Sequence, residues 1–126
     1  DATYYAALCA VRLNQRSAEY KLQQFIQNNP VSKHLINARF ELALLYFRQK
    51  KYKQAVKSFD EIDVFYLSEA QKDEMHYKQG YSYFSINEDD KAAAAFFSLI
   101  DNMISSFQRT QFFQKFTRLT TAYMTT

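Results

Sequence analysis

The sequence predicts an all-α fold: a solenoid of three helical hairpins with a 37-residue period, followed by a C-terminal helix. Three observations lead there. The 126 residues include one Gly and one Pro, which leaves little turn material for a many-stranded fold. Apolar residues recur at helical spacing along most of the chain. Small and aromatic residues also return at a fixed interval, as they do in repeat architectures. The length suits one compact unit.

The repeat is carried by two sets of small residues and one set of large apolar residues, each spaced by 37 positions. These sets are Ala6, Ala43 and Gly80; Ala18, Ala55 and Ala92; and Leu22, Phe59 and Phe96. A small residue lets the partner helix approach closely, while residues one and two turns further on fill the remaining gap. We expect repeats over residues 1–31, 32–67 and 68–105.

Start and stop signals divide each repeat into two helices. Asn29-Pro30 ends the first hairpin, and Ser32 is the expected N-cap of the next helix. Ser68 with Gln71 forms a capping-box pattern. Asn87 suits the left-handed conformation that a helix-ending turn needs. We expect helices over residues 3–13, 15–28, 33–49, 52–63, 69–86 and about 90–104.

The last segment departs from the repeat. Phe112, Phe116, Leu119 and Tyr123 form a stripe at helical spacing, although the 37-residue register fails here. Arrays commonly end in an atypical capping helix. We therefore expect a seventh helix over Arg109–Tyr123, within a capping unit at 109–124, packed on the third hairpin. We also expect the chain to be part of a longer array.

The central hairpin carries a family pattern, F-x-L-A-x-x-Y followed by Y-x-x-A-x-x-x-F. Its residues are Phe40, Leu42, Ala43, Tyr46, Tyr52, Ala55 and Phe59. The third hairpin matches at Tyr77, Gly80, Tyr83, Ala92 and Phe96, and the first at Ala6, Ala18, Leu22 and Pro30. This pattern resembles the tetratricopeptide repeat (TPR), whose usual period is about 34 residues. The resemblance implies a right-handed α-solenoid that acts as a protein-binding scaffold without catalytic activity.

A narrower resemblance rests on the step Pro30–Ser32 and the A-x-F-x-L-A run that begins at Ala38. Together with the long period, these features resemble the TPR lipoproteins of bacterial outer-membrane assembly. They imply a bacterial protein in the periplasm or at the outer membrane. No apolar run approaches the ~18 residues that cross a bilayer, so we expect no transmembrane segment.

The sequence contains no set of residues that is typical of a catalytic or metal-binding site. His34 and His76 lie in different repeats, without the spacing of metal ligands. Cys9 lies among alanines and Leu8, where we expect a buried, inert thiol. Gly80 is the one glycine, so a Gly-rich phosphate loop is excluded. We expect no enzyme activity, no cofactor and no metal.

The sequence has more aromatic residues than a small core needs, which favours a binding surface. The TPR resemblance implies that the first helix of each hairpin turns one side toward a concave groove. We expect this groove to be lined by Tyr4, Phe40, Leu44, Phe47, Arg48, Tyr77, Lys78, Tyr81 and Phe84. Such a groove suits an apolar helix or an extended peptide. A clamp for a C-terminal carboxylate is not expected, because apolar residues hold the positions of its Lys, Asn and Arg.

Two alternatives stay open. Arg39, Lys50, Lys51, Lys53 and Lys57, with exposed tyrosines, offer the basic and stacking groups that single-stranded nucleic acids use. The net charge is only +3, however, and acidic residues alternate with the basic ones, so no nucleic acid is expected. The second alternative is self-association through the exposed ends of the repeat array, because an uncovered repeat presents an apolar face.

Overall fold

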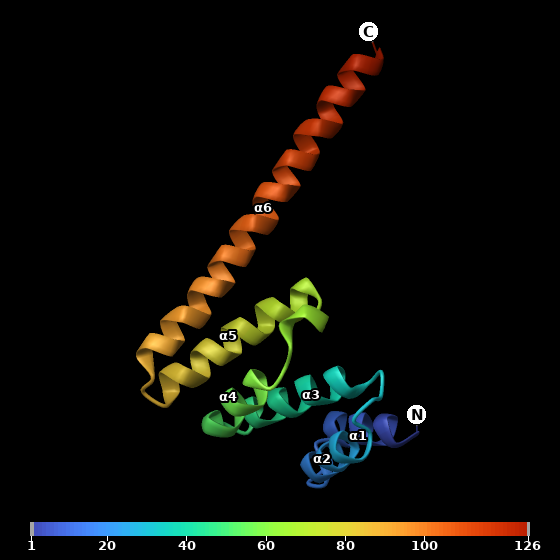
Figure 1. The fold of residues 1–126 in the computed structure, drawn as a ribbon, viewed down its shortest axis with the longest axis vertical. Helices are drawn as coiled ribbons and strands as arrows, with labels where there is room; N and C mark the ends of the chain where they lie inside the picture. The colour runs from blue at the N-terminus through green and yellow to red at the C-terminus, as the bar shows by residue number, and fades with distance from the viewer. Residues whose placement is uncertain (1, 126) are drawn as a thin grey trace.

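The computed structural model describes residues 2–125, apart from the side chains of Phe116, Thr120, Tyr123, Met124 and Thr125. Its helices are α1 (Ala2–Arg12), α2 (Ala18–Asn28), α3 (Leu35–Arg48), α4 (Tyr52–Asp60), the 3-10 helix η1 (Val64–Tyr66), α5 (Glu69–Ser85) and α6 (Asp89–Thr125). Consecutive helices pack as hairpins, and the hairpins stack in chain order (Figure 1). Helix α6 continues far beyond the stack. The predicted all-α solenoid is confirmed.

The three hairpin turns share one backbone motif. Asn14, Lys50 and Asn87 have positive φ angles of 53°, 60° and 65°. In each turn, the N–H of this residue bonds to the carbonyl three positions back, and the next N–H bonds to the carbonyl five positions back. These paired bonds define a Schellman motif, which satisfies the last carbonyls of the helix. The left-handed conformation predicted at Asn87 is confirmed.

The shared turn motif corrects the register of the first repeat. Asn14 lies 36 residues before Lys50, whereas Lys50 lies 37 before Asn87. The helical position of Ala43 is therefore held by Ala7, which is fully buried, and not by Ala6, which is exposed. The missing residue lies just after the turn, because Ala18 follows Asn14 by four positions and Ala55 follows Lys50 by five. The small-residue anchor predicted at Ala6 was wrong by one position.

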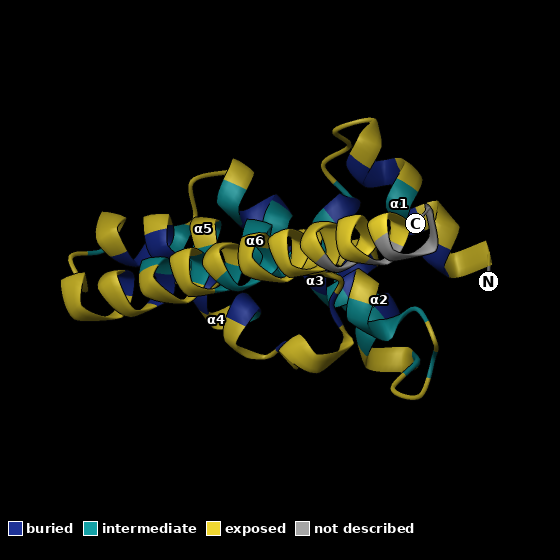
Figure 2. Ribbon diagram, turned by 90° about the horizontal axis from the view of Figure 1, so that it is seen from above, coloured by how far each residue is buried: buried dark blue, intermediate teal, exposed yellow. Residues whose placement is uncertain are grey.

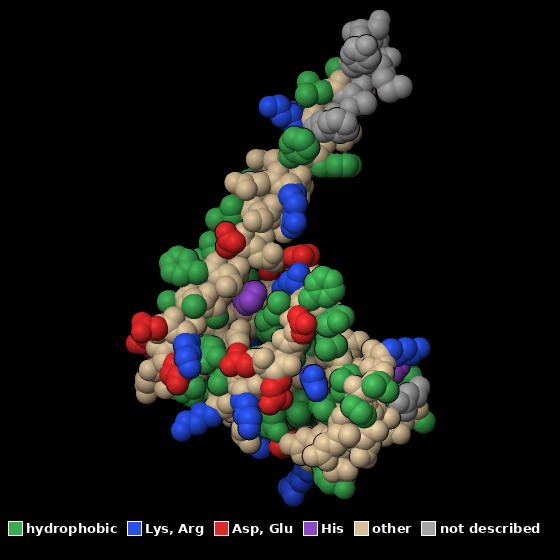
Figure 3. Space-filling model, viewed as in Figure 1, with side chains coloured by type: hydrophobic (Ala, Val, Ile, Leu, Met, Phe, Trp, Pro, Cys, Tyr) green, Lys and Arg blue, Asp and Glu red, His purple; other side chains and the backbone are tan. Residues whose placement is uncertain are grey.

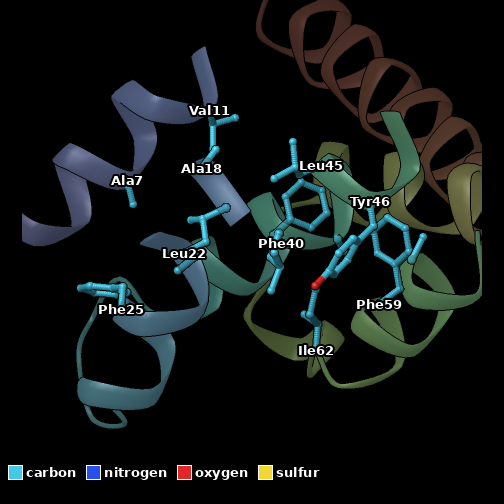
Figure 4. Packing of buried hydrophobic residues seen from close by; sticks show 14 of the residues in the cluster. Ala7, Val11, Ala18, Leu22, Phe25, Phe40, Leu45, Tyr46, Phe59 and Ile62 are labelled. Carbon is cyan, nitrogen blue, oxygen red and sulfur yellow. The ribbon is translucent and has the colours of Figure 1, made fainter. Parts of the chain in front are cut away.

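The core occupies the first two hairpins and the start of the third. Leu22, Phe25, Ala43, Ala55 and Phe59 are at most 1% exposed. Side chains from α1 to α4 converge on this interior (Figure 4). A smaller cluster of Val56, Tyr83 and Ala92, with Ile86 and Phe96 against it, joins the third hairpin to the second. Close helix packing at the small residues agrees with the sequence pattern.

Of the two helix N-caps predicted from the sequence, the one at the start of α5 is present and the one at the start of α3 is not. Ser68 Oγ accepts from the Gln71 N–H at 3.2 Å, and Gln71 Oε1 accepts from the Ser68 N–H at 3.0 Å, which confirms the capping box. The Ser32 side chain instead accepts from the His34 N–H at 3.1 Å. This short turn delays the start of α3 to Leu35.

The expected separate seventh helix was wrong, because α6 is continuous from Asp89 to Thr125. No Gly or Pro follows Gly80, so nothing local ends the helix. The hydroxyls of Thr110, Thr117 and Thr121 each donate to the carbonyl four residues earlier, at 2.9 Å. The segment 109–123 therefore projects from the third hairpin and does not pack on it (Figure 1).

The predicted apolar stripe of the last segment is only partly described. Phe112 and Leu119 are 74% and 62% exposed, while the side chains of Phe116 and Tyr123 lie outside the described ones. Figure 2 shows α6 exposed along most of its length.

Cys9 is exposed, which overturns its predicted burial. Helix α1 buries the face that holds Tyr4, Ala7 and Val11, and at 3.6 residues per turn Cys9 lies on the other side.

Candidate protein-interaction surface

Helix α5 carries three exposed aromatic side chains on one face, which we call the aromatic stripe. Tyr77, Tyr81 and Phe84 are spaced i, i+4 and i+7, so they lie above one another along the helix. Their exposed fractions are 51%, 43% and 64%. Three large rings on one helical face provide a ready apolar contact surface.

The middle ring of the stripe is held by two neighbouring helices. The Tyr81 ring lies 5.6 Å from Phe47 of α3 and 5.8 Å from Tyr52 of α4, between ring centroids. Phe47 and Tyr52 are themselves 5.9 Å apart. Burial, with Tyr81 close by, raises the pKa of Tyr52 above its usual value. The contacts fix the orientation of Tyr81 before any ligand binds.

A cation borders this ring cluster. Lys78 Nζ lies 5.4 Å from the centre of the Phe47 ring, in cation–π contact, and 2.8 Å from Glu74 Oε1. Arg48 is exposed at the end of α3. Arg48 lines a hollow beside the first hairpin turn, with Asn14 and Gln15, so Lys78 and not Arg48 borders the ring cluster.

Of the nine residues predicted to line a groove, two lie in the core. Tyr4 and Phe40 are 6% and 4% exposed. The Tyr4 ring stacks on His34 at 4.2 Å, and Phe40 meets Phe59 edge-on at 6.4 Å. Leu44 is half-buried. No continuous ladder runs from the first hairpin to the third in the described residues.

The difference between Phe40 and Tyr77 follows from their place in the array. Both rings meet the equivalent Phe of the following helix at 6.4 Å, Phe59 for Phe40 and Phe96 for Tyr77. Phe40 belongs to a core that includes Met75 of the next hairpin. Among the described residues no later hairpin covers Tyr77, because α6 runs to Thr125 without turning back. Equivalent sequence positions therefore have unequal exposure.

The motif tyrosines connect one repeat to the one before it. Tyr46 Oη donates to Glu19 Oε1 at 2.9 Å, and Tyr83 Oη donates to Asp60 Oδ2 at 2.9 Å. Burial and the hydrogen bond to Asp60 raise the pKa of Tyr83 to about 12. The sequence pattern identified both tyrosines as positions of the repeat motif but not as polar links between repeats.

The basic residues of the nucleic-acid alternative do not gather in one patch. Lys51 Nζ lies 3.6 Å from Glu19 Oε2. Arg39 and Lys57 line a hollow of ≈ 530 Å³ between α2, α3 and α4, together with Glu61 and three glutamines. Acidic and basic side chains alternate over the visible face of the stack (Figure 3). This arrangement lacks the basic stripe of a nucleic-acid surface.

Within residues 2–125, no three His, Cys, Asp or Glu side chains come together as metal ligands. Burial lowers the pKa of His34 and of His76. In the same range, no helix has the length and apolar character to cross a bilayer.

The sequence prediction missed two features. Tyr52 was assigned to the repeat pattern and not to the aromatic surface. The exposed apolar side chains of α6, among them Phe97, Ile104 and Phe107, were not recognised as a surface. With Ile100 included, their spacing of three, four and three residues was a signal that could have revealed them.

Three stacked helical hairpins with equivalent turns, and an exposed aromatic face, define an α-solenoid repeat protein of the interaction class. A sequence profile described as tetratricopeptide repeat matches residues 1–32, 37–62 and 74–102, more than half of the chain. The chain therefore belongs to the tetratricopeptide repeat family, whose repeats generally act as protein–protein interaction modules. No curated protein and no solved structure matches the chain. The narrower resemblance to envelope lipoproteins stays a prediction.

Proposed function

We propose that this chain is a non-catalytic scaffold that docks an apolar helix or an extended peptide of a partner protein on the aromatic stripe. The observation that carries the proposal is the exposure of Tyr77, Tyr81 and Phe84 on one face of α5. Aromatic rings held in place are the usual anchors of protein interfaces, and few of them supply most of the binding energy.

The surroundings of the stripe favour a ligand with an apolar face. Phe47 and Tyr52 hold Tyr81 in position, so little side-chain entropy is lost on binding. Lys78, which is paired with Glu74, lies over the Phe47 ring at the edge of the cluster. An amphipathic helix with anchors at i, i+3 or i+4 and i+7 matches the spacing of the stripe.

A peptide display selection on the 126-residue chain tests the proposal. Binders selected on the wild type should lose affinity about tenfold or more in Tyr81→Ala and in Phe84→Ala, as expected for interface anchors. Tyr20→Ala is the matched control, because Tyr20 is 63% exposed on α2, away from the stripe. Circular dichroism checks that helicity is retained. Unchanged binding in both stripe variants refutes the proposal.

A finer proposal places this scaffold in the bacterial envelope, and it is supported by the sequence resemblance around Pro30 and Ala38. Fractionation of cells that express the protein tests it, with periplasmic or outer-membrane recovery as the expected result. Recovery with the cytoplasmic fraction contradicts it.

A further inference from the structure

The outward face of α6 carries a symmetrical pattern of residues, which we call the α6 seam. Its members are Phe97, Asp101, Ile104, Gln108, Phe112, Lys115 and Leu119. Their spacing is 4-3-4-4-3-4, which reads the same in both directions from Gln108. At 3.6 residues per turn, all seven lie within about 40° of one common direction on the helix.

The α6 seam lies opposite the face that packs on α5. Ala92 and Ala95 are buried against the hairpin, and Asn102 Nδ2 donates to Asp73 Oδ1 of α5 at 2.7 Å. These residues lie about 120–160° around the helix from the middle of the seam. All seven seam residues are exposed. Apolar side chains can be followed along the projecting part of α6 in Figure 3.

The seam is apolar at four of its seven positions. Phe97, Ile104, Phe112 and Leu119 are 71%, 51%, 74% and 62% exposed. Isolated helices are marginal in water, and here the last turns of α6 extend past the start of α5 with no covering element in the described residues. An exposed apolar face of this length is typical of an interaction site.

We propose that a second copy of this chain covers the seam, with the two α6 helices antiparallel about a two-fold axis at Gln108. In this pairing, the numbers of two residues that face each other, one from each copy, add up to 216. Phe97 then faces Leu119 of the second copy, and Ile104 faces Phe112. Gln108 faces its own equivalent, where two amides can bond to each other.

Charge selects this pairing over a parallel one. Asp101 and Lys115 are the charged members of the seam, and antiparallel pairing places each Asp101 opposite Lys115 of the other copy. Neither forms an ion pair among the described residues. A parallel pair with matched ends would set Asp101 against Asp101 and Lys115 against Lys115, which is repulsive. The self-complementary pattern is what a two-fold interface requires.

The geometry and area of the pair are also adequate. The 4-3 spacing is that of a coiled coil, here an antiparallel one. The extra step of four at Gln108 locally unwinds the supercoil, and it does so equally for both helices. From Phe97 to Leu119 the seam runs about 33 Å. Eight half- to three-quarter-exposed apolar side chains offer roughly 1,000 Å², near the lower limit for a specific interface. The α5 helices lie on the outer sides, clear of the contact.

Sedimentation velocity over a concentration series tests the proposal. The wild-type chain should form a dimer of twice 14.9 kDa. Asp101→Lys and Lys115→Asp should each raise the dimer dissociation constant about tenfold or more, because each places like charges opposite one another twice per dimer. The double variant D101K/K115D should restore the wild-type dissociation constant. A wild-type monomer at every concentration overturns the proposal.

Arg118→Asp is the matched control, since it changes charge equally on the same turns but lies about 80° from the middle of the seam. It should leave the dissociation constant within a few-fold of the wild type. If the single variants dimerise as the wild type does, or if the double variant does not recover, antiparallel pairing through this seam is wrong. Circular dichroism of each variant separates a lost dimer from a lost helix.

Discussion

Gly80 of α5 lies against the Phe96 ring of α6, and its replacement by Ala tests how tightly the third hairpin is packed. A Cβ atom built at Gly80 would lie 2.7 Å from Phe96 Cε1 and 2.9 Å from Phe96 Cδ1 and Cζ. Ordinary carbon contacts are longer by most of an ångström. The Phe96 ring, which is half-buried, must shift to admit the methyl group.

Two terms of opposite sign set the size of the effect. Replacing Gly by Ala inside a helix stabilises it by about 1 kcal/mol. Forcing an extra methyl group into a packed contact costs about 1–3 kcal/mol. We expect Gly80→Ala to lower the free energy of unfolding by about 0–2 kcal/mol. In a Phe96→Leu background the clash is relieved, so the same change should raise it by about 0.5–1 kcal/mol.

Urea unfolding followed by circular dichroism, at one fixed protein concentration, measures the four proteins of this cycle. The expected coupling energy between the two positions is about 0.5–3 kcal/mol. Equal stabilisation by Gly80→Ala in both backgrounds would refute the reasoning, because it would mean that the helices are not in close contact at Gly80. Ala43→Gly, at the equivalent position of the second hairpin, should be destabilising and serves as the control.

Three further predictions concern single groups. Tyr83→Phe removes the hydrogen bond to Asp60 and should cost about 0.5–1.5 kcal/mol. Because the pKa of Tyr83 is raised to about 12, wild-type stability should fall as pH rises from 10 towards 12, and less so in the Phe variant. Burial lowers the pKa of His76 below 6.5, so stability present above pH 6.5 should decline as pH falls, and His76→Gln should decline less. With Cys9→Ser as background, Gln108→Cys should form a disulfide-linked dimer on oxidation, because both copies meet at this residue.

Each of these has its own check. Urea unfolding over a pH series measures the tyrosine and histidine variants, and a slope equal to that of the wild type would contradict the stated cause. Gln111→Cys is the control for cross-linking, because in the antiparallel pair its equivalent lies about 9 Å away along the axis. Equal cross-linking rates at 108 and 111 on a non-reducing gel would contradict the pairing.

Local features of the fold were predictable from the sequence. Ser68 and Gln71 form the expected capping box, and Asn87 adopts the expected left-handed turn. Both depend on residues within a few positions of each other, so a short stretch of sequence determines them. The one-residue error in the first repeat has a simple cause, because Ala6 and Ala7 are equally small and only packing distinguishes them.

Features that depend on the whole array were not predictable. Phe40 and Tyr77 hold equivalent positions, but only Phe40 is enclosed by a following hairpin. The proposed binding surface is therefore a stripe on α5, which is smaller than the predicted groove over three hairpins. The continuity of α6 was missed because the change of repeat register near residue 105 was taken as a helix end, although no Gly or Pro occurs there.

The threonines of α6 make its last turns less polar than their composition suggests. The hydroxyls of Thr110, Thr117 and Thr121 are already bonded to carbonyls of their own helix. Such a side chain can be buried in an interface while its hydroxyl stays hydrogen-bonded. The group that it presents outward is largely a methyl group. A segment that reads as a polar, weakly helical tail can thus pass into an interface at low desolvation cost.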